Sequence, residues 1–242
     1  MPPGRCLEGK LAVVTGASGG IGREIALALA ASGAELRLAG RNAPALADLA
    51  GACGPGAASA AVDFEDEEAT ERWTTALAEA CPRIDVLVHA AGVIALAPIG
   101  EAQLADFDRQ YRVNVRAPYA VTRALLPLLR SSRGQVIFLN SSAGLTARAG
   151  AGQYAATKHA LAAVADSLRE ECNADGVRVT SVFLGRTASA MQSAVHQAEG
   201  KAYHPERLVQ PGDVAAVVLN ALSLPRTAEV TEITMRPLQK PA

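Results

Sequence analysis

Tyr154 and Lys158 are the residues whose types and spacing point most directly to chemistry. Because they lie four positions apart, a helix would place both side chains on one face. A free phenol has a pKa of about 10, which is too high for ready proton exchange near neutrality. A neighbouring ammonium favours the phenolate and lowers that pKa, so Lys158 would make Tyr154 a usable general acid or base. Alone, this spacing is common on ordinary helix surfaces.

A serine-containing stretch precedes this pair along the chain. The sequence Asn140-Ser141-Ser142-Ala143-Gly144 follows an apolar run, and Ser141 lies thirteen residues before Tyr154. The Ser141 hydroxyl could hydrogen-bond a reacting carbonyl oxygen and stabilise the charge that develops there.

A glycine-rich turn at 15–22 joins the first apolar run to a helical stretch. Glycines let the backbone turn tightly and approach a pyrophosphate, and the N-terminus of the following helix offers unpaired N–H groups. The spacing is Gly16-x-x-x-Gly20-x-Gly22 rather than the GxGxxG of most dinucleotide-binding folds. The alternative is a merely tight turn. We expect dinucleotide contacts from Gly16, Ser18, Gly19, Gly20, Ile21 and Gly22.

Gly40 and Arg41 bear on which dinucleotide would bind. NAD-dependent enzymes commonly place an acidic residue here, about 20 residues past the glycines, to bind the ribose 2′-hydroxyl. Gly40 leaves no carboxylate to repel a 2′-phosphate, and Arg41 could pair with one. We therefore expect NADP(H) in preference to NAD(H), the alternative being a solvated Arg41. Asp63 would accept a hydrogen bond from the adenine amino group or else cap a helix.

Short apolar runs alternate with longer Ala- and Leu-rich stretches along the chain. They predict strands at 11–15, 35–39, 58–62, 85–89, 135–140, 178–183 and 230–234, and helices at about 20–32, 43–50, 66–80, 101–130, 152–173 and 212–223. Continuous apolar strands are typical of a parallel sheet covered on both faces. We expect an α/β fold, a doubly wound (Rossmann) parallel sheet of about seven strands, with its site at the strands' carboxyl ends.

No linker rich in proline, glycine or serine divides the chain, so 1–242 is expected to form a single dinucleotide-binding catalytic domain. The long irregular segment 185–210 follows the carboxyl end of a predicted strand. Loops of this length in compact domains are usually lids or binding loops. We interpret it as a substrate loop; the alternative is a surface excursion with a short helix.

Composition narrows the class of protein. Half of the residues are hydrophobic, 19% are charged and the formal net charge is −1, so neither a nucleic-acid surface nor a membrane surface is expected. No apolar stretch approaches the roughly 20 residues that span a bilayer, and residues 1–10 lack the apolar region of a secretory signal. Four scattered cysteines argue against disulfides and a metal site, which favours the cytoplasm.

Together these motifs resemble the classical short-chain dehydrogenase/reductase family over essentially the whole chain. The matching residues are 15–22, Asn114 in Val113-Asn114-Val115, Ser141, Tyr154 and Lys158, in order and at the family's spacing. The resemblance implies that Tyr154 is the general acid/base and that Lys158 lowers its pKa while holding the nicotinamide ribose. It also implies that Ser141 orients the substrate and that Asn114 supports a water-mediated proton relay.

Three segments depart from the family pattern. The family's Asn-Asn-Ala-Gly reads His89-Ala90-Ala91-Gly92, so two amide side chains are lost while Ala91 and Gly92 remain near the adenosine ribose. His89 is either a relay member or a satisfied core histidine. The family's Pro-Gly reads Leu184-Gly185, which softens a rigid turn. The chain also ends without a glycine-rich segment, as in the subgroup that acts on small hydroxy acids and assorted carbonyls.

Thr187 and Ser189 still fall where the family contacts the nicotinamide carboxamide. We therefore expect an NADP(H)-dependent oxidoreductase, carbonyl reductase-like, that moves hydride between nicotinamide and a carbonyl or secondary alcohol. One alternative is an NAD(P)-dependent dehydrogenase of a small 3-hydroxy acid, whose carboxylate Arg148 could hold unless it is simply solvated. A non-enzymatic alternative is a dinucleotide-sensing regulator.

The resemblance also implies self-association. In this family the helices expected at 101–130 and 152–173 pair across a two-fold axis, and alanines such as Ala160 and Ala163 would allow close approach of their backbones. We expect a homotetramer rather than a homodimer, the alternative being that the alanines face the chain's own sheet. The substrate and the physiological direction cannot be read from the sequence.

Overall fold

The strands form one parallel sheet in the order β3-β2-β1-β4-β5-β6-β7. A computed structural model describes residues 6–239. The stretch 1–10 is expected not to be a secretory signal, and its first half, residues 1–5, lies outside the described residues. The strands are β1 (Leu11–Thr15), β2 (Glu35–Gly40), β3 (Ala57–Ala61), β4 (Val86–His89), β5 (Gln135–Ser141), β6 (Arg178–Leu184) and β7 (Glu232–Met235). The doubly wound α/β fold, in a single domain, is confirmed.

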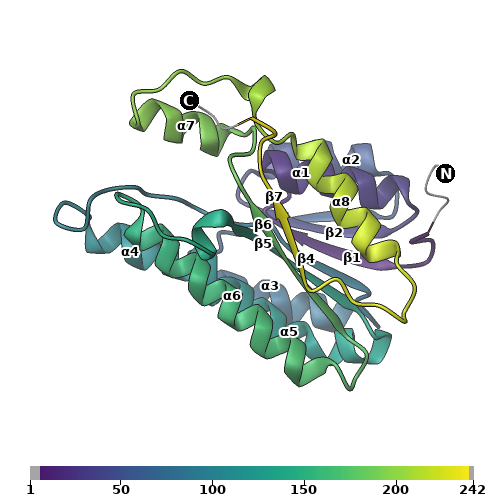
Figure 1. The fold of residues 1–242 in the computed structure, drawn as a ribbon. Helices are drawn as coiled ribbons and strands as arrows, with labels where there is room; N and C mark the ends of the chain where they lie inside the picture. The colour runs from purple at the N-terminus through teal and green to yellow at the C-terminus, as the bar shows by residue number, and fades with distance from the viewer. Residues whose placement is uncertain (1–5, 240–242) are drawn as a thin grey trace.

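Helices cover both faces of the sheet (Figure 1). The helices α1 (Gly20–Ala31), α2 (Ala43–Cys53) and α8 (Pro211–Ser223) pack on one face through residues such as Ile25, Leu46 and Val218. The helices α3 (Glu67–Ala80), α5 (Ala117–Ser132) and α6 (Gly152–Cys172) pack on the other through residues such as Leu77 and Leu125. Apolar side chains on both faces explain why the central strands are apolar throughout.

The helix expected at 101–130 is interrupted. It consists of α4 (Leu104–Tyr111), a π-helical turn at Arg112–Arg116 and α5. Asn114 lies inside that turn, and its side chain is hydrogen-bonded to the backbone of Val93. Single π-turns inside α-helices frequently occur at functional sites. Hydrophobic periodicity could not reveal this one because the apolar pattern continues through it.

The segment predicted to be irregular, 185–210, contains a helix. It holds α7 (Ala190–Ala198) and a short 3₁₀ turn at Pro205–Arg207. Its two ends lie side by side, because Thr187 bridges Val209 and the Ala188 N–H donates to the Val209 carbonyl at 2.8 Å. The excursion therefore leaves the sheet and returns at one point, with α7 above the carboxyl edge (Figure 1).

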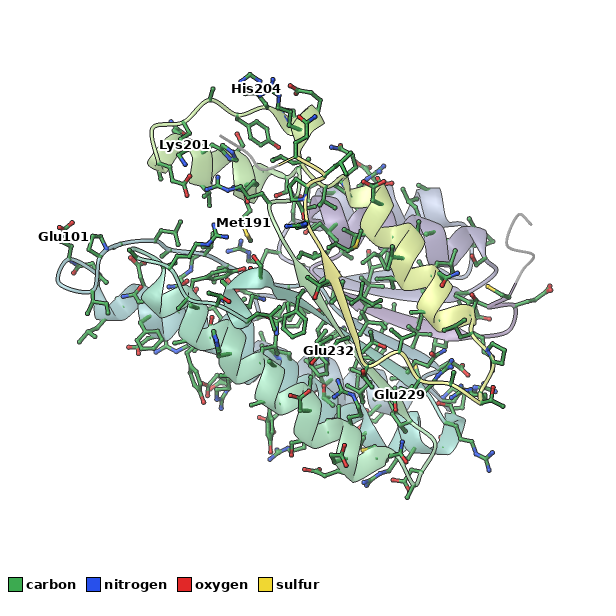
Figure 2. The ribbon with its side chains drawn as sticks, viewed as in Figure 1. Glu101, Met191, Lys201, His204, Glu229 and Glu232 are labelled. Carbon is green, nitrogen blue, oxygen red and sulfur yellow. The ribbon has the colours of Figure 1, made fainter. Side chains whose placement is uncertain are left out.

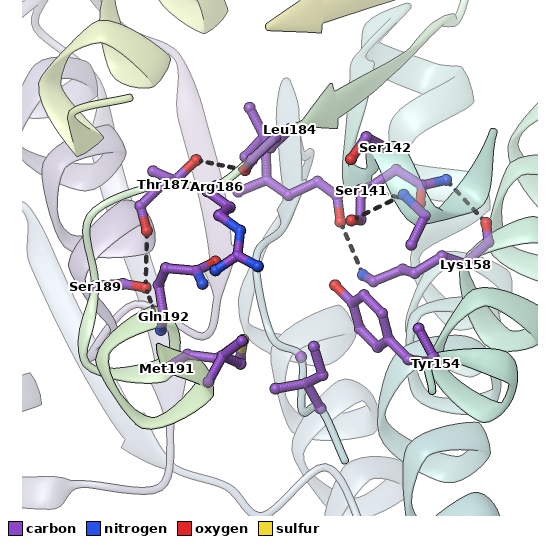
Figure 3. Close-up of a pocket in the computed structure, with 18 of the residues that line it drawn as sticks. Ser141, Ser142, Tyr154, Lys158, Leu184, Arg186, Thr187, Ser189, Met191 and Gln192 are labelled. Carbon is purple, nitrogen blue, oxygen red and sulfur yellow. Dashed lines mark hydrogen bonds between the residues drawn. The ribbon is translucent and has the colours of Figure 1, made fainter. Parts of the chain in front are cut away.

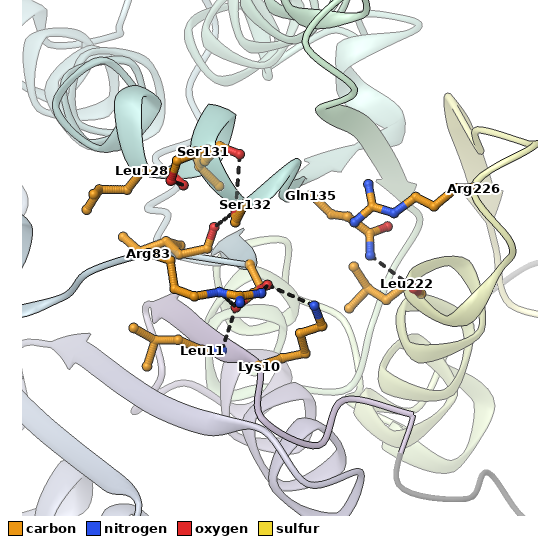
Figure 4. A network of polar contacts seen from close by, with 12 residues as sticks. Lys10, Leu11, Arg83, Leu128, Ser131, Ser132, Gln135, Leu222 and Arg226 are labelled. Atoms are coloured by element: carbon orange, nitrogen blue, oxygen red, sulfur yellow. Dashed lines mark hydrogen bonds and ion pairs between the residues drawn. The ribbon is translucent and has the colours of Figure 1, made fainter.

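Asp85 joins the start of β4 to the start of β1. Its side chain is almost fully buried and accepts hydrogen bonds from the Leu11 N–H at 3.0 Å, from Lys10 Nζ at 3.1 Å and from the Arg83 guanidinium. These three partners are drawn in Figure 4. Burial by itself raises the pKa of Asp85, but the hydrogen bonds from its partners outweigh burial and hold that pKa below its ordinary value.

Asp85→Asn should lower the free energy of unfolding by about 2 kcal/mol near pH 7, since charge-assisted hydrogen bonds to a buried carboxylate are lost. Because the pKa of Asp85 is lower in the folded state than in the unfolded state, its carboxylate stabilises the fold above the ordinary carboxyl pKa. This stabilisation is lost as the pH falls through the folded-state pKa. The difference between wild type and variant should therefore narrow below about pH 4. Urea unfolding at several pH values measures it. The exposed Asp48, substituted by Asn, is the control, and a pH-independent difference would contradict this assignment.

Candidate active site

Ser141, Tyr154 and Lys158 meet at the carboxyl edge of the sheet (Figure 3). Ser141 is the last residue of β5, while Tyr154 and Lys158 lie in the first two turns of α6. The Tyr154 phenol is hydrogen-bonded to Ser141, and Lys158 Nζ lies 5.8 Å from the centroid of the Tyr154 ring. The three residues that spacing alone suggested are thus brought to one cavity of about 220 Å³.

Gly144 and Asn140 hold α6 against the end of β5. The Asn140 amide donates to the Lys158 carbonyl at 3.1 Å, and its Oδ1 accepts from the Ser141 N–H at 2.7 Å. A Cβ at Gly144 would lie 2.7 Å from Asn140 Oδ1 and 2.8 Å from the Lys158 carbonyl oxygen, so only glycine fits. Sequence reasoning missed the role of Asn140; its signal was a polar residue ending an otherwise apolar strand.

Burial dominates the electrostatics of this pair. Lys158 is buried, donates from Nζ to the Leu139 carbonyl at 3.2 Å, and has its pKa lowered to about 8 by burial. Burial also raises the pKa of Tyr154, and the hydrogen bond with Ser141 offsets this only in part. This is opposite to the direction expected from the sequence, because the effect of burial on the phenol outweighs the hydrogen bond that favours its ionisation. Near neutrality Tyr154 therefore carries its proton.

Asn114 lies behind the pair in the π-helical turn. Its amide donates to the Val93 carbonyl at 2.9 Å and to Thr157 Oγ1 at 3.1 Å, while its Oδ1 accepts from the Val93 N–H. A Cβ at Gly92 would lie 3.5 Å from Asn114 Oδ1 and 3.9 Å from Lys158 Nζ, so the two groups border one space. Its expected part in a proton relay stays a prediction.

A second cavity, of about 270 Å³, runs along the glycine-rich turn and joins the first. The two share lining residues Ala90, Ala91, Gly92 and Met191, among others. Met191 belongs to α7, whereas Lys201 and His204 lie on the outer part of the same excursion (Figure 2). Every expected cofactor-binding residue lines one or both cavities: Gly16, Ser18, Gly19, Gly20, Ile21, Gly22, Arg41, Asp63, Ala91, Gly92, Tyr154, Lys158, Thr187 and Ser189.

The glycine-rich turn is shaped for close backbone approach. Gly16 has a φ of +65°, and a Cβ there would lie 2.5 Å from the Ala91 nitrogen. A Cβ at Gly22 would lie 2.4 Å from the Gly16 carbonyl oxygen. No side chain caps α1 at Gly19, so the first N–H groups of the helix are left for a ligand or water. This cradle fits the pyrophosphate of a dinucleotide.

Arg41 and Asp63 lie at the far end of this second cavity. Arg41 is exposed and has no hydrogen-bond or ion-pair partner among residues 6–239. Asp63 is also exposed, and its Oδ1 accepts from the Glu65 N–H at 3.1 Å, within a turn. Asp66, not Asp63, caps α3 through the Ala69 N–H. Helix capping, one of the two functions considered for Asp63, is therefore performed by Asp66.

His89 is a core residue. It is buried, stacks on Phe138 with ring centroids 4.8 Å apart, and its Nε2 is 2.8 Å from Thr122 Oγ1. Burial lowers its pKa to about 3, so the imidazole is neutral. His89 lines neither cavity. The structure therefore favours the satisfied core histidine over the relay member.

Thr187 and Ser189 follow Leu184 and Gly185 as α7 begins. The Thr187 hydroxyl donates to the Gly185 carbonyl at 3.1 Å, and the Ser189 hydroxyl caps α7 by accepting from the Gln192 N–H. Within residues 6–239, no cluster of His, Cys, Asp or Glu is arranged to hold a metal ion, and no helix is long and apolar enough to cross a membrane.

Comparison with known proteins agrees with this geometry. The family model for short chain dehydrogenases matches residues 10–200. Glycine betaine reductase ATRR of Emericella nidulans is 32% identical over 97% of this chain, which spans only 19% of that relative's length.

Two solved structures share the fold over nearly their whole length. An alcohol dehydrogenase from the archaeon Thermococcus sibiricus, complexed with 5-hydroxy-NADP, superposes with a TM-score of 0.87 at 27% identity, covering 96% of this chain and 99% of that one. A metagenomic short-chain oxidoreductase in complex with NADP has a TM-score of 0.82 at 31% identity, covering 97% and 100%. The chain belongs to the short-chain dehydrogenase family of oxidoreductases.

Proposed function

We propose that this chain is an NADP(H)-dependent oxidoreductase that interconverts a carbonyl compound and its secondary alcohol. The observation that carries the proposal is the hydrogen-bonded Ser141 and Tyr154 hydroxyls in a cavity that opens into the glycine-lined one. A nicotinamide dinucleotide, when bound, supplies or accepts the hydride. The regulator alternative has less support, because sensing a dinucleotide would need neither hydroxyl.

The chain's own residues supply the proton and the orientation. Ser141 would hydrogen-bond the substrate oxygen and hold it beside the Tyr154 phenol. Because burial keeps Tyr154 protonated near neutrality, its phenol can donate a proton to a carbonyl oxygen during reduction. Lys158, buried beside it, would stabilise the phenolate that this transfer leaves and would hold the ribose. Asn114 would link Lys158 to a proton relay through water.

Two observations support NADP(H) over NAD(H). Arg41 reaches the second cavity without a carboxylate partner among the described residues, and no acidic residue occupies position 40. The two structural neighbours described above were solved with NADP or a derivative of it. A guanidinium pairs well with a phosphate, so Arg41 would bind the ribose 2′-phosphate.

We also propose a homo-oligomer, a tetramer rather than a dimer, in the cytoplasm. An exposed groove between α5 and α6 is lined by Tyr119, Leu126, Ala163 and Val164, among others. The alanines of α6 divide between two faces: Ala155 and Ala165 are buried, whereas Ala156 and Ala163 are exposed. The exposed set would allow close helix approach across a two-fold axis. All four cysteines are free, as in a reducing compartment.

Tyr154→Phe should reduce turnover by about 10²- to 10⁴-fold, because it removes the proton donor while keeping the ring. NADPH affinity, measured by fluorescence titration, should stay within a few-fold of wild type. Tyr111→Phe, a change at an exposed tyrosine in α4, is the matched control. Near-normal turnover in Tyr154→Phe would rule out this mechanism.

Arg41→Ala should weaken NADPH binding by about 10- to 150-fold, the value of a charge-assisted hydrogen bond of about 1.5–3 kcal/mol, and leave NADH nearly unaffected. Calorimetric titration with both cofactors measures the difference, which should shrink at high salt. Arg72→Ala on the exposed face of α3 serves as the control. Equal losses for NADPH and NADH would show that Arg41 does not read the phosphate.

Light scattering at micromolar concentration should give the mass of a tetramer. Ala163→Arg should lower that mass, because an arginine in the groove between α5 and α6 would block close approach of a second copy. Ala52→Arg, at an exposed position of α2, is the control. A monomeric wild type would contradict the oligomer.

A further inference from the structure

We propose that the substrate carries a carboxylate bound by Arg186 and Arg148, so that this enzyme acts on small oxo or hydroxy acids. The inference rests on the proposed function and specifies its substrate class. Arg186 was not singled out by any sequence motif; it lies between β6 and α7 and lines the cavity that holds Ser141 and Tyr154. Figure 3 shows its guanidinium across the cavity from Tyr154.

The charged residues of this cavity are mostly cationic. Lys158, Arg148 and Arg186 line it, and Glu199 is the one acidic residue among its lining residues. Glu199 is already engaged, because both of its oxygens accept from Arg186, at 2.8 and 2.6 Å. The cavity thus has a net positive charge, which favours an anionic ligand.

Arg186 is held in place by α7 and the residues after it. Besides the bonds to Glu199, its Nη1 lies 3.2 Å from His196 Nε2. The buried His196 has its Nδ1 at 2.8 Å from the Gln192 carbonyl, so Nδ1 donates there and Nε2 accepts from the guanidinium. The Tyr203 ring packs edge-on against His196 with centroids 5.3 Å apart. The guanidinium is therefore preorganised at the cavity wall.

This arrangement leaves donors for a ligand. A guanidinium has five N–H groups, and His196 and Glu199 are contacted through Nη1 and Nη2 only. The Arg186 Nε–H has no acceptor among the described residues. This free donor, together with the positive charge of the guanidinium, would bind one carboxylate oxygen of a substrate.

Arg148 provides a second cation from the loop after Ser141. Its side chain is exposed, lines the same cavity and has no hydrogen-bond or ion-pair partner among residues 6–239. The rest of the wall is largely apolar, with Ile94, Leu96 and Met191. An apolar wall beside two arginines suits a small molecule with a short apolar body and one anionic end.

The test compares matched substrates. A panel of small oxo acids and their methyl esters is assayed with NADPH, and the ratio of kcat/KM for each acid to that for its ester is measured. The wild-type ratio should exceed about 10, the effect expected of one charge-assisted hydrogen bond. A ratio near one, with turnover that still depends on Tyr154, would overturn this inference while leaving the proposed function intact. Absence of any carbonyl reduction would instead reject the proposed function.

Variants separate recognition from a purely structural role. Arg186→Met and Arg148→Met should each lower the acid-to-ester ratio about tenfold, whereas Glu199→Gln should raise it, because a competing carboxylate is removed. If Arg186 only anchored α7, then Arg186→Met and Glu199→Gln would break the same contact and change the ratio in the same direction. That result would overturn the proposal. Arg207→Met, at an exposed arginine outside the cavity, should leave the ratio unchanged.

Discussion

Close backbone contact at three glycines is the constraint on which the rest of the site depends. A side chain at Gly16 would collide with the Ala90–Ala91 peptide, one at Gly22 with the Gly16 carbonyl, and one at Gly144 with Asn140 and the Lys158 carbonyl. The contacts at Gly22 and Gly144 bring a helix N-terminus onto the end of a buried strand, and the contact at Gly16 brings the turn after β1 against the segment after β4. Because β1, β4 and β5 are parallel and adjacent, the glycine cradle and the Ser141–Tyr154 pair come to the same edge of the sheet.

Desolvation then sets the protonation of the groups gathered there. Burial lowers the pKa of Lys158 to about 8 and raises that of Tyr154, so near neutrality the ammonium stays charged and the phenol keeps its proton. Burial also keeps His89 neutral in the core. The cations beside the substrate, Arg148 and Arg186, lie nearer to solvent on two flanking loops. In the proposed mechanism, proton transfer and substrate recognition would thus be carried out by different layers of the same cavity.

The sequence predicted the features that depend on local pattern. The sequence indicated all seven strands, because the strands of a buried parallel sheet are apolar runs. It also indicated the glycine turn and the set of Ser141, Tyr154 and Lys158, because these residues stand at the fixed spacing of a motif. Features decided by tertiary contact could not. The π-turn at Asn114 does not disturb the apolar pattern, α7 stands within a segment that looked irregular, and the Tyr154 pKa depends on burial. The partners of Arg186 are His196 in α7 and Glu199 directly after it, and no local sequence pattern indicates these contacts.

We propose that the two joined cavities form one site in which hydride passes directly from nicotinamide to a carbonyl carbon. Single-turnover reduction with NADPH deuterated at the transferring position of nicotinamide, followed by mass and NMR analysis of the alcohol, tests this most directly. We expect one deuterium on the carbinol carbon and none from the solvent. Deuterium lost to water, or a carbinol hydrogen derived from solvent, would contradict the account.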